Sequence, residues 1–93
     1  MEKPYLSNLL KLIAQPERMA LLFALLEGDR NVNELAQALD LPATIVSTHL
    51  AKLRAEGIVE YTRYHRIIEY RLISEDAAEI LYTLRRLSSR TEN

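Results

Sequence analysis

The N-terminal part of the chain carries two apolar stripes with the period of an α-helix. The first follows Pro4, which can occupy the first position of a helix, and consists of Leu6, Leu9, Leu10 and Ile13. The second follows Pro16 and consists of Met19, Leu22, Phe23 and Leu26. Gly28 stands where a left-handed C-terminal cap would lie. Two N-terminal helices are therefore predicted.

Two shorter helices are predicted next, separated by a tight turn. Asn31 and Glu34 have the spacing of a capping box, which predicts a short helix that ends at Leu39. Residues 43–56 carry apolar side chains on one side and are followed by Gly57, which predicts a second helix. Those apolar side chains are Val46, Leu50 and Leu53. Two helices joined by a short turn form a helix-turn-helix arrangement.

After these helices the pattern changes to strand-forming residues around a polar centre. Residues 58–72 are rich in Ile, Val, Tyr and Thr, which predicts a β-hairpin. No Asn-Gly or Asp-Gly pair marks its turn, so we place the turn near residues 64–66 and leave the register open. Ser74 can cap a last helix that ends near Arg85 and Arg86, complementary to the helix dipole. Its apolar stripe consists of Ile80, Leu84 and Leu87.

The composition fits one small globular domain of 93 residues, 48% apolar and 27% charged. The absence of cysteine excludes disulfides, thiolate metal sites and thiol nucleophiles. No apolar run is long enough to span a membrane and no signal peptide is visible, so we expect a soluble, cytoplasmic protein. No glycine-rich phosphate loop, activated nucleophile or carboxylate pair occurs, which argues against an enzyme.

The net charge of -1 gives no global indication of nucleic-acid binding, but the charges are unevenly distributed. Residues 43–71 contain five basic and three acidic residues, whereas residues 1–42 contain four basic and six acidic ones. Any DNA-binding surface is therefore expected in the middle of the chain.

Four pieces of the sequence, in their order along the chain, resemble the arsenic-repressor-like (ArsR-type) family. They are AQPERMALLFALLEG, NELAQAL, VSTHLAKLRAEGIV and the paired hairpin arginines, Arg63 and Arg66. The resemblance implies a winged helix-turn-helix fold of α-α-α-α-β-β-α order, mainly α with a small β-hairpin. It also implies a homodimeric DNA-binding repressor that recognises a palindromic operator. The expected single domain, residues 1–93, comprises dimerisation helices at 1–15 and 74–89, a helix-turn-helix at 31–56 and a wing at 57–73.

Three residues depart from the family pattern. Asp40 replaces the usual glycine of the interhelical turn, and Asp is one of the few other residues that tolerate a left-handed backbone. Pro42 stands where a capping serine is common, so the next helix is expected to begin with proline at its first position and to lack one side-chain cap. His65 occupies a wing-tip position that is often glycine, which leaves the conformation of the tip open.

The polar side of residues 43–56 is the expected DNA-reading surface, because it lies opposite the apolar stripe. Its hydroxyl groups can touch any base edge, and threonine methyls can pack on thymine methyls. The basic residues of this helix and the hairpin are candidate phosphate ligands, although Arg66 could instead enter the minor groove. The alternative for all of them is an ordinary solvated surface. The predicted DNA-binding residues are Thr44, Ser47, Thr48, His49, Lys52, Arg54, Arg63, His65 and Arg66.

His49 lies between the apolar and polar sides of its helix, so a structural hydrogen bond and a DNA contact both stay open. The two histidines, His49 and His65, cannot hold zinc alone, because such sites usually need about four ligands. Glu75, Asp76 and Glu79 lack a histidine partner in the last helix and are interpreted as a solvated acidic face. No metal and no cofactor is predicted.

The apolar stripes of the first and last helices are expected to form the dimer interface, as the family resemblance implies, with packing inside one domain as the alternative. The predicted interface consists of Leu6, Leu9, Leu10, Ile13, Ile80, Leu84 and Leu87. A winged helix that binds another protein is the alternative function. A small apolar effector between helices is a further hypothesis, for which the sequence identifies no pocket.

Overall fold

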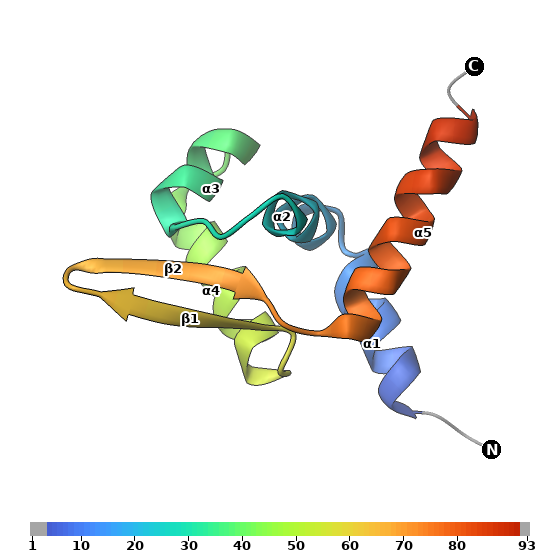
Figure 1. Cartoon of the computed structure of the whole chain (residues 1–93), viewed down its shortest axis with the longest axis horizontal. Helices are drawn as coiled ribbons and strands as arrows, with labels where there is room; N and C mark the ends of the chain where they lie inside the picture. Colours follow the sequence, from blue (N-terminus) through green and yellow to red (C-terminus); the bar gives the residue numbers. More distant parts are fainter. Residues whose placement is uncertain (1–3, 92–93) are drawn as a thin grey trace.

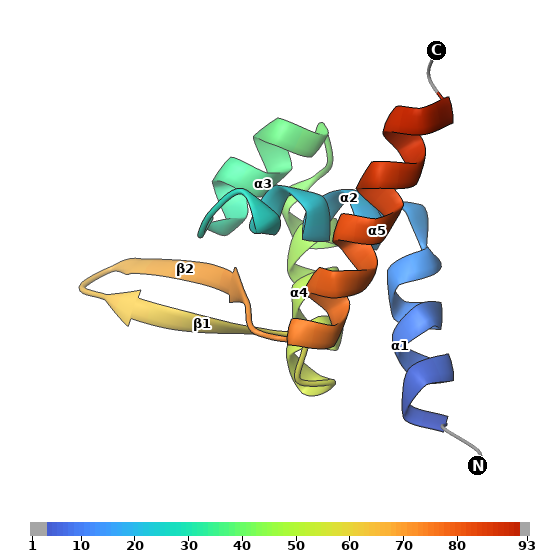
Figure 2. The ribbon, with the colours of Figure 1, turned by 45° about the vertical axis from the view of Figure 1, so that its right-hand side comes forward.

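The computed structural model describes residues 4–91, which form five helices and one antiparallel hairpin (Figure 1). The elements are α1 (Pro4–Ala14), α2 (Pro16–Leu26), α3 (Val32–Leu39), α4 (Ala43–Ala55), β1 (Val59–Tyr64), β2 (Ile67–Leu72) and α5 (Glu75–Thr91). This order confirms the predicted α-α-α-α-β-β-α arrangement. The hairpin projects from one side of the molecule, and α1 and α5 lie on the other side (Figures 1 and 2).

The core forms where every helix turns its apolar side inward. Leu21 and Leu22 of α2, Leu35 of α3 and Leu50 of α4 are fully buried, and Leu81 of α5 joins them. The apolar stripes of the sequence thus face one another, which removes their surface from water and stabilises the domain.

Two residues of the predicted dimer interface lie in this core instead. Leu9 and Ile13 of α1 are 1% and 2% exposed within a single chain. Since α1 packs on α2, these two side chains point into the chain's own interior. Their assignment to the dimer interface is therefore wrong, and only the outer residues of the α1 stripe are available to a partner.

The helix ends follow the capping chemistry of the sequence. The Oδ1 of Asn31 accepts from the Glu34 backbone N–H at 2.8 Å, and the Asn31 N–H donates to Glu34 Oε1 at 2.9 Å, which confirms the capping box. Asp40 takes the left-handed conformation in the turn after α3, with φ 56°. Pro42 is the N-cap of α4 rather than its first helical residue, and α4 has no side-chain cap, as expected. Ser74 caps α5 by accepting from the Ala77 N–H at 3.0 Å.

The hairpin closes through a two-residue turn, His65 and Arg66, between the paired residues Tyr64 and Ile67. His65 has φ 60°, so this non-glycine residue supplies the positive φ that short hairpin turns require. A third segment joins the sheet edge: the backbone groups of Arg30 and Tyr70 exchange hydrogen bonds of 3.1 and 2.7 Å. This bridge ties the hairpin to the start of the helix-turn-helix and has no pattern in the sequence.

A side-chain hydrogen bond links the two terminal helices. Tyr5 of α1 donates its hydroxyl hydrogen to Asp76 Oδ2 of α5 at 2.7 Å. This hydrogen bond to a carboxylate raises the pKa of the Tyr5 hydroxyl above its usual value of 10.0. Within residues 4–91, no helix is long and apolar enough to cross a membrane.

Candidate nucleic-acid interface

The outward face of α4 is exposed along its whole length. Thr44, Ser47, Thr48 and Lys52 all lie on the exposed surface, while Val46, Leu50 and Leu53 are buried on the opposite side. The helix thus presents hydroxyl groups and one ammonium group to solvent. These groups can hydrogen-bond to base edges or phosphates, and an α-helix fits the width of the DNA major groove.

His49 occupies a different position from the other predicted DNA-binding residues of α4. Its Nε2 lies 2.8 Å from Oε1 of Glu17 on α2, and its side chain is only 13% exposed. Of the two roles that the sequence left open, the structure shows the hydrogen bond within the protein. His49 therefore fixes α4 against α2.

Arg54 extends from α4 toward the hairpin. Its guanidinium carbon lies 4.4 Å from the ring centroid of Tyr61 on β1, a cation–π geometry. Tyr61 in turn packs edge-on against Tyr70 of β2, with ring centroids 5.6 Å apart. Arg54 thereby links α4 to the hairpin, while its exposed guanidinium edge can still donate to a phosphate.

The hairpin carries three arginines in two different situations. Arg71 pairs with Glu60 across the strands at 3.1 Å. Arg63 near the end of β1 and Arg66 in the turn are exposed, and neither side chain makes a hydrogen bond or ion pair within residues 4–91. The unpaired positive charge of the hairpin is thus concentrated near its tip, where His65 is also exposed.

Two basic residues that were not among the predicted DNA-binding residues lie beside the outward face of α4. Lys11 of α1 and Arg18 of α2 line a groove of about 270 Å³ together with Lys52 of α4. Arg18 also donates to the carbonyl of Leu12 at 2.8 Å, which satisfies the C-terminal end of α1. Basic groups beside α4 therefore come from α1 and α2 as well as from the middle of the chain. No sequence pattern reveals this, because the three residues meet only through helix packing.

Ile45 is a further exposed residue of α4 that the sequence analysis missed. It is 39% exposed and is not among the apolar residues packed on the core. The periodicity of the helix could have predicted this exposure, since Ile45 falls outside the buried stripe of Val46, Leu50 and Leu53.

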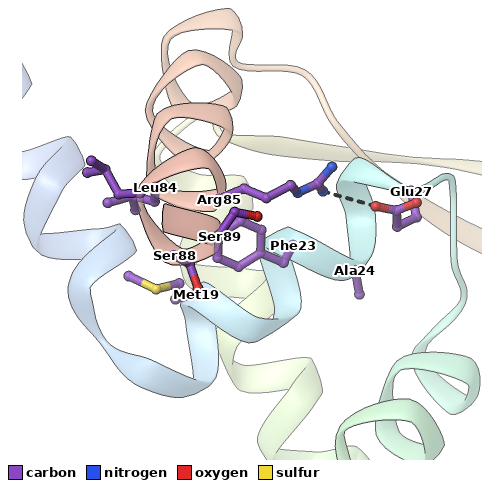
Figure 3. Close-up of a pocket in the computed structure, with 9 residues that line it drawn as sticks. Met19, Phe23, Ala24, Glu27, Leu84, Arg85, Ser88 and Ser89 are labelled. Atoms are coloured by element: carbon purple, nitrogen blue, oxygen red, sulfur yellow. Dashed lines mark hydrogen bonds and ion pairs between the residues drawn. The ribbon is translucent and has the colours of Figure 1, made fainter. Parts of the chain in front are cut away.

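An apolar surface remains on the terminal helices, away from the hairpin. Leu6 and Leu10 of α1 and Leu87 of α5 are exposed, and Ile80 and Leu84 are half-buried. A groove of about 920 Å³ between α2 and α5 adjoins this surface (Figure 3). Its lining residues are Met19, Phe23, Ala24, Glu27, Leu84, Arg85, Leu87, Ser88 and Ser89. An ion pair of 2.9 Å between Arg85 and Glu27 closes one side, as Figure 3 shows.

No group of three or more histidine and acidic side chains gathers as a metal site anywhere in the described part of the chain. In particular, Glu75, Asp76 and Glu79 do not converge with a fourth ligand, and Asp76 accepts from Tyr5.

The sequence model of the arsR family of bacterial regulatory proteins matches residues 15–61, the segment that holds the helix-turn-helix and the start of the hairpin. The chain belongs to the arsR family. A relative in that family, the HTH-type transcriptional repressor SmtB of Mycobacterium tuberculosis, is 41% identical over 74 residues, which cover 80% of this chain. The same match covers 55% of SmtB, so this chain spans about half the length of that relative.

Solved structures of arsR-type regulators show the same fold. The transcriptional repressor BigR of Xylella fastidiosa is 36% identical and superposes with a TM-score of 0.83 over 88% of this chain and 84% of its own. A homodimeric winged helix-turn-helix DNA-binding domain of Mycobacterium bovis, described as a possible ArsR-family regulator, is 27% identical with a TM-score of 0.81. That match covers 92% of this chain and 80% of the Mycobacterium bovis domain. The winged helix-turn-helix fold is thereby confirmed, and nothing in these relatives supports a protein-interaction module.

Proposed function

We propose that this arsR-family protein binds duplex DNA as a homodimer and represses transcription in the cytoplasm, without catalysing a reaction. The observation that carries the proposal is the pairing of an exposed, hydroxyl-rich face on α4 with two unpaired arginines, Arg63 and Arg66, at the hairpin tip. The descriptions of SmtB and BigR as transcriptional repressors support the same function.

In this proposal α4 enters the major groove and the hairpin lies along the adjacent backbone. Thr44, Ser47 and Thr48 face the base edges, and Lys52 and Arg54 contact phosphates on the two flanks of α4. Arg63, His65 and Arg66 of the hairpin reach the next phosphates or the minor groove. His49 contributes by fixing the orientation of α4 through Glu17 rather than by touching DNA.

The homodimer supplies the second half of the DNA-binding surface. The helices α1 and α5, which carry the exposed apolar residues, lie on the side of the molecule away from the hairpin (Figure 2), so a two-fold contact there leaves both hairpins available. A two-fold dimer whose α4 helices lie about 34 Å apart would recognise a palindromic site on one face of DNA.

The test is DNA binding by wing variants after selection of bound duplexes from a random library. Arg63→Ala and Arg66→Ala should each weaken binding to the selected duplexes about tenfold, and reduce the salt dependence by about 0.9 per lost phosphate contact. Arg71→Ala is the matched control, because Arg71 lies in the same hairpin but is paired with Glu60. Unchanged binding by both tip variants would contradict the wing model, and retention of no duplex at low salt would contradict DNA binding itself.

A further inference from the structure

The outward face of α4 is unusual for a DNA-reading helix because it is rich in methyl groups. Side chains that recognise guanine or adenine with two hydrogen bonds are Arg, Lys, Asn and Gln. The helix contains neither Asn nor Gln, its arginine is drawn over Tyr61, and Lys52 lies toward the groove shared with α1 and α2. The remaining outward side chains end in hydroxyl or methyl groups.

Ile45 adds a large apolar side chain to this face. It is 39% exposed and does not belong to the hydrophobic core. A single exposed isoleucine is ordinary on a protein surface, but Ile45 lies beside Thr48, at the flank of the α4 face that the proposed function directs at DNA. Ile45 and Thr48 are three residues apart, so they are neighbours on the helix surface.

The internal hydrogen bond of Thr48 increases the apolar character of this face. Its Oγ1 donates to the carbonyl oxygen of Thr44, one turn earlier, at 2.9 Å. The hydroxyl hydrogen is therefore used within the helix, and Thr48 offers DNA an acceptor oxygen and a methyl group. Methyl groups thus occur at neighbouring positions of this face, since Thr48 lies three residues from Ile45 and four from Thr44.

We infer that this surface, which we call the methyl patch (Thr44, Ile45 and Thr48), recognises the C5-methyl groups of thymines in the major groove. The inference rests on the proposed DNA binding and adds which feature of the bases α4 distinguishes. Among the bases, only thymine presents a methyl group in the major groove. Contact between it and Ile45 removes apolar surface from water on both sides, whereas a cytosine or purine edge there would lose hydration without a partner.

The test removes the thymine methyl groups without changing base pairing. Duplexes selected by the wild-type protein are synthesised again with deoxyuridine in place of thymidine, one position at a time. Replacement of a contacted thymine should weaken binding about fourfold, and replacement of its symmetry mate as well should weaken binding about fifteenfold. Replacement of thymines outside the two half-sites should have no effect on binding.

Protein variants identify the residue that makes the contact. Because Ile45→Ala removes the contact in both half-sites of the dimer, binding to the thymine duplex should fall about fifteenfold, and deoxyuridine at the contacted positions should cost no further affinity. Ile73→Ala is the matched control, because Ile73 has the same 39% exposure but lies between β2 and α5, and it should retain the full deoxyuridine effect. Alanine is a good helix former, so Ile45→Ala is expected to fold.

The outcomes separate this inference from the function on which it rests. If the wild-type protein binds selected duplexes tightly but deoxyuridine at every thymine of the half-site leaves affinity unchanged, the inference is overturned and DNA binding stands. An equal deoxyuridine effect in Ile45→Ala would overturn the role of Ile45. If the wild-type protein retains no duplex, both the proposed function and the inference fail.

Discussion

The guanidinium carbon of Arg54 lies 4.4 Å from the ring centroid of Tyr61, so that α4 and the hairpin are joined by a side-chain contact as well as by the chain between them. The ring of Tyr61 also packs edge-on against Tyr70, which itself forms the backbone bridge to Arg30. These contacts therefore support the placement of the hairpin relative to α4.

A double-mutant cycle measures this contact. Arg54→Ala, Tyr61→Leu and the double variant should show a coupling of about 0.5–1 kcal/mol in the free energy of unfolding, as expected for an exposed cation–π pair. Urea denaturation of the four proteins supplies the values. Tyr61→Leu should lose more stability than Arg54→Ala, because it also removes the aromatic pair with Tyr70. Additive effects of the two single changes would show that the contact contributes nothing in solution.

The hydrogen bond between His49 and Glu17 leads to a second prediction. Glu17→Ala leaves the half-buried Nε2 of His49 without its partner, which should reduce the free energy of unfolding by about 1–2 kcal/mol. Glu17→Gln keeps an acceptor oxygen at the same place and should lose less. Urea denaturation at neutral pH compares the two variants.

The same pair predicts an effect on DNA. If His49 acts by holding α4 against α2, Glu17→Ala and His49→Ala should weaken binding to all selected duplexes by a similar factor. Fluorescence anisotropy with several duplexes checks this. A change of sequence preference in His49→Ala that Glu17→Ala does not share would show that His49 touches bases.

Much of the fold follows from local patterns in the sequence, whereas the residues that meet through packing do not. The stripe of Val46, Leu50 and Leu53 predicts both α4 and its buried side, because periodicity is a local property. The Arg30–Tyr70 bridge has no such pattern, since it pairs one residue between α2 and α3 with a residue of β2 that is 40 positions further along the chain. The stripe on α1 likewise shows an apolar side but not which of its residues face α2 and which face solvent.

The hairpin turn provides a third prediction. His65 has φ 60°, where a side chain costs about 1–2 kcal/mol and glycine does not. Part of this gain is lost because glycine makes the unfolded chain more flexible, so His65→Gly should raise the free energy of unfolding by about 0.5–1 kcal/mol. Thermal or urea denaturation measures the change.

Gly57 supplies the opposite control. It has φ 77°, and a Cβ added there would meet no atom within 4 Å, so Gly57→Ala tests backbone strain alone. We expect Gly57→Ala to reduce the free energy of unfolding by about 1 kcal/mol. If both substitutions were neutral, the positive φ values at these turns would carry no energetic cost.

The last prediction concerns the proposed dimer. Substitution of two adjacent leucines of α1 should have different effects, one on dimerisation and the other on folding stability. Leu10 is 52% exposed on the apolar side of α1, whereas Leu9 is buried in the core. Leu10→Glu would place a carboxylate twice in a two-fold interface, which should raise the dimer dissociation constant at least tenfold, about 1.4 kcal/mol. Leu9→Ala should instead cost about 2–5 kcal/mol of folding stability through the cavity it creates.

Sedimentation velocity over a range of concentrations, together with urea denaturation, separates the two effects. Ile67→Glu is the matched control, since Ile67 has the same 52% exposure as Leu10 but lies in the hairpin, where a charge should leave the dimer intact. Since an exposed glutamate on α1 removes no buried contact, Leu10→Glu should stay folded at concentrations where it is monomeric. If Leu10→Glu were as dimeric as the wild type, the dimer interface would lie on another surface. The basis for a spacing of about 34 Å between the two α4 helices, one turn of DNA, would then be lost.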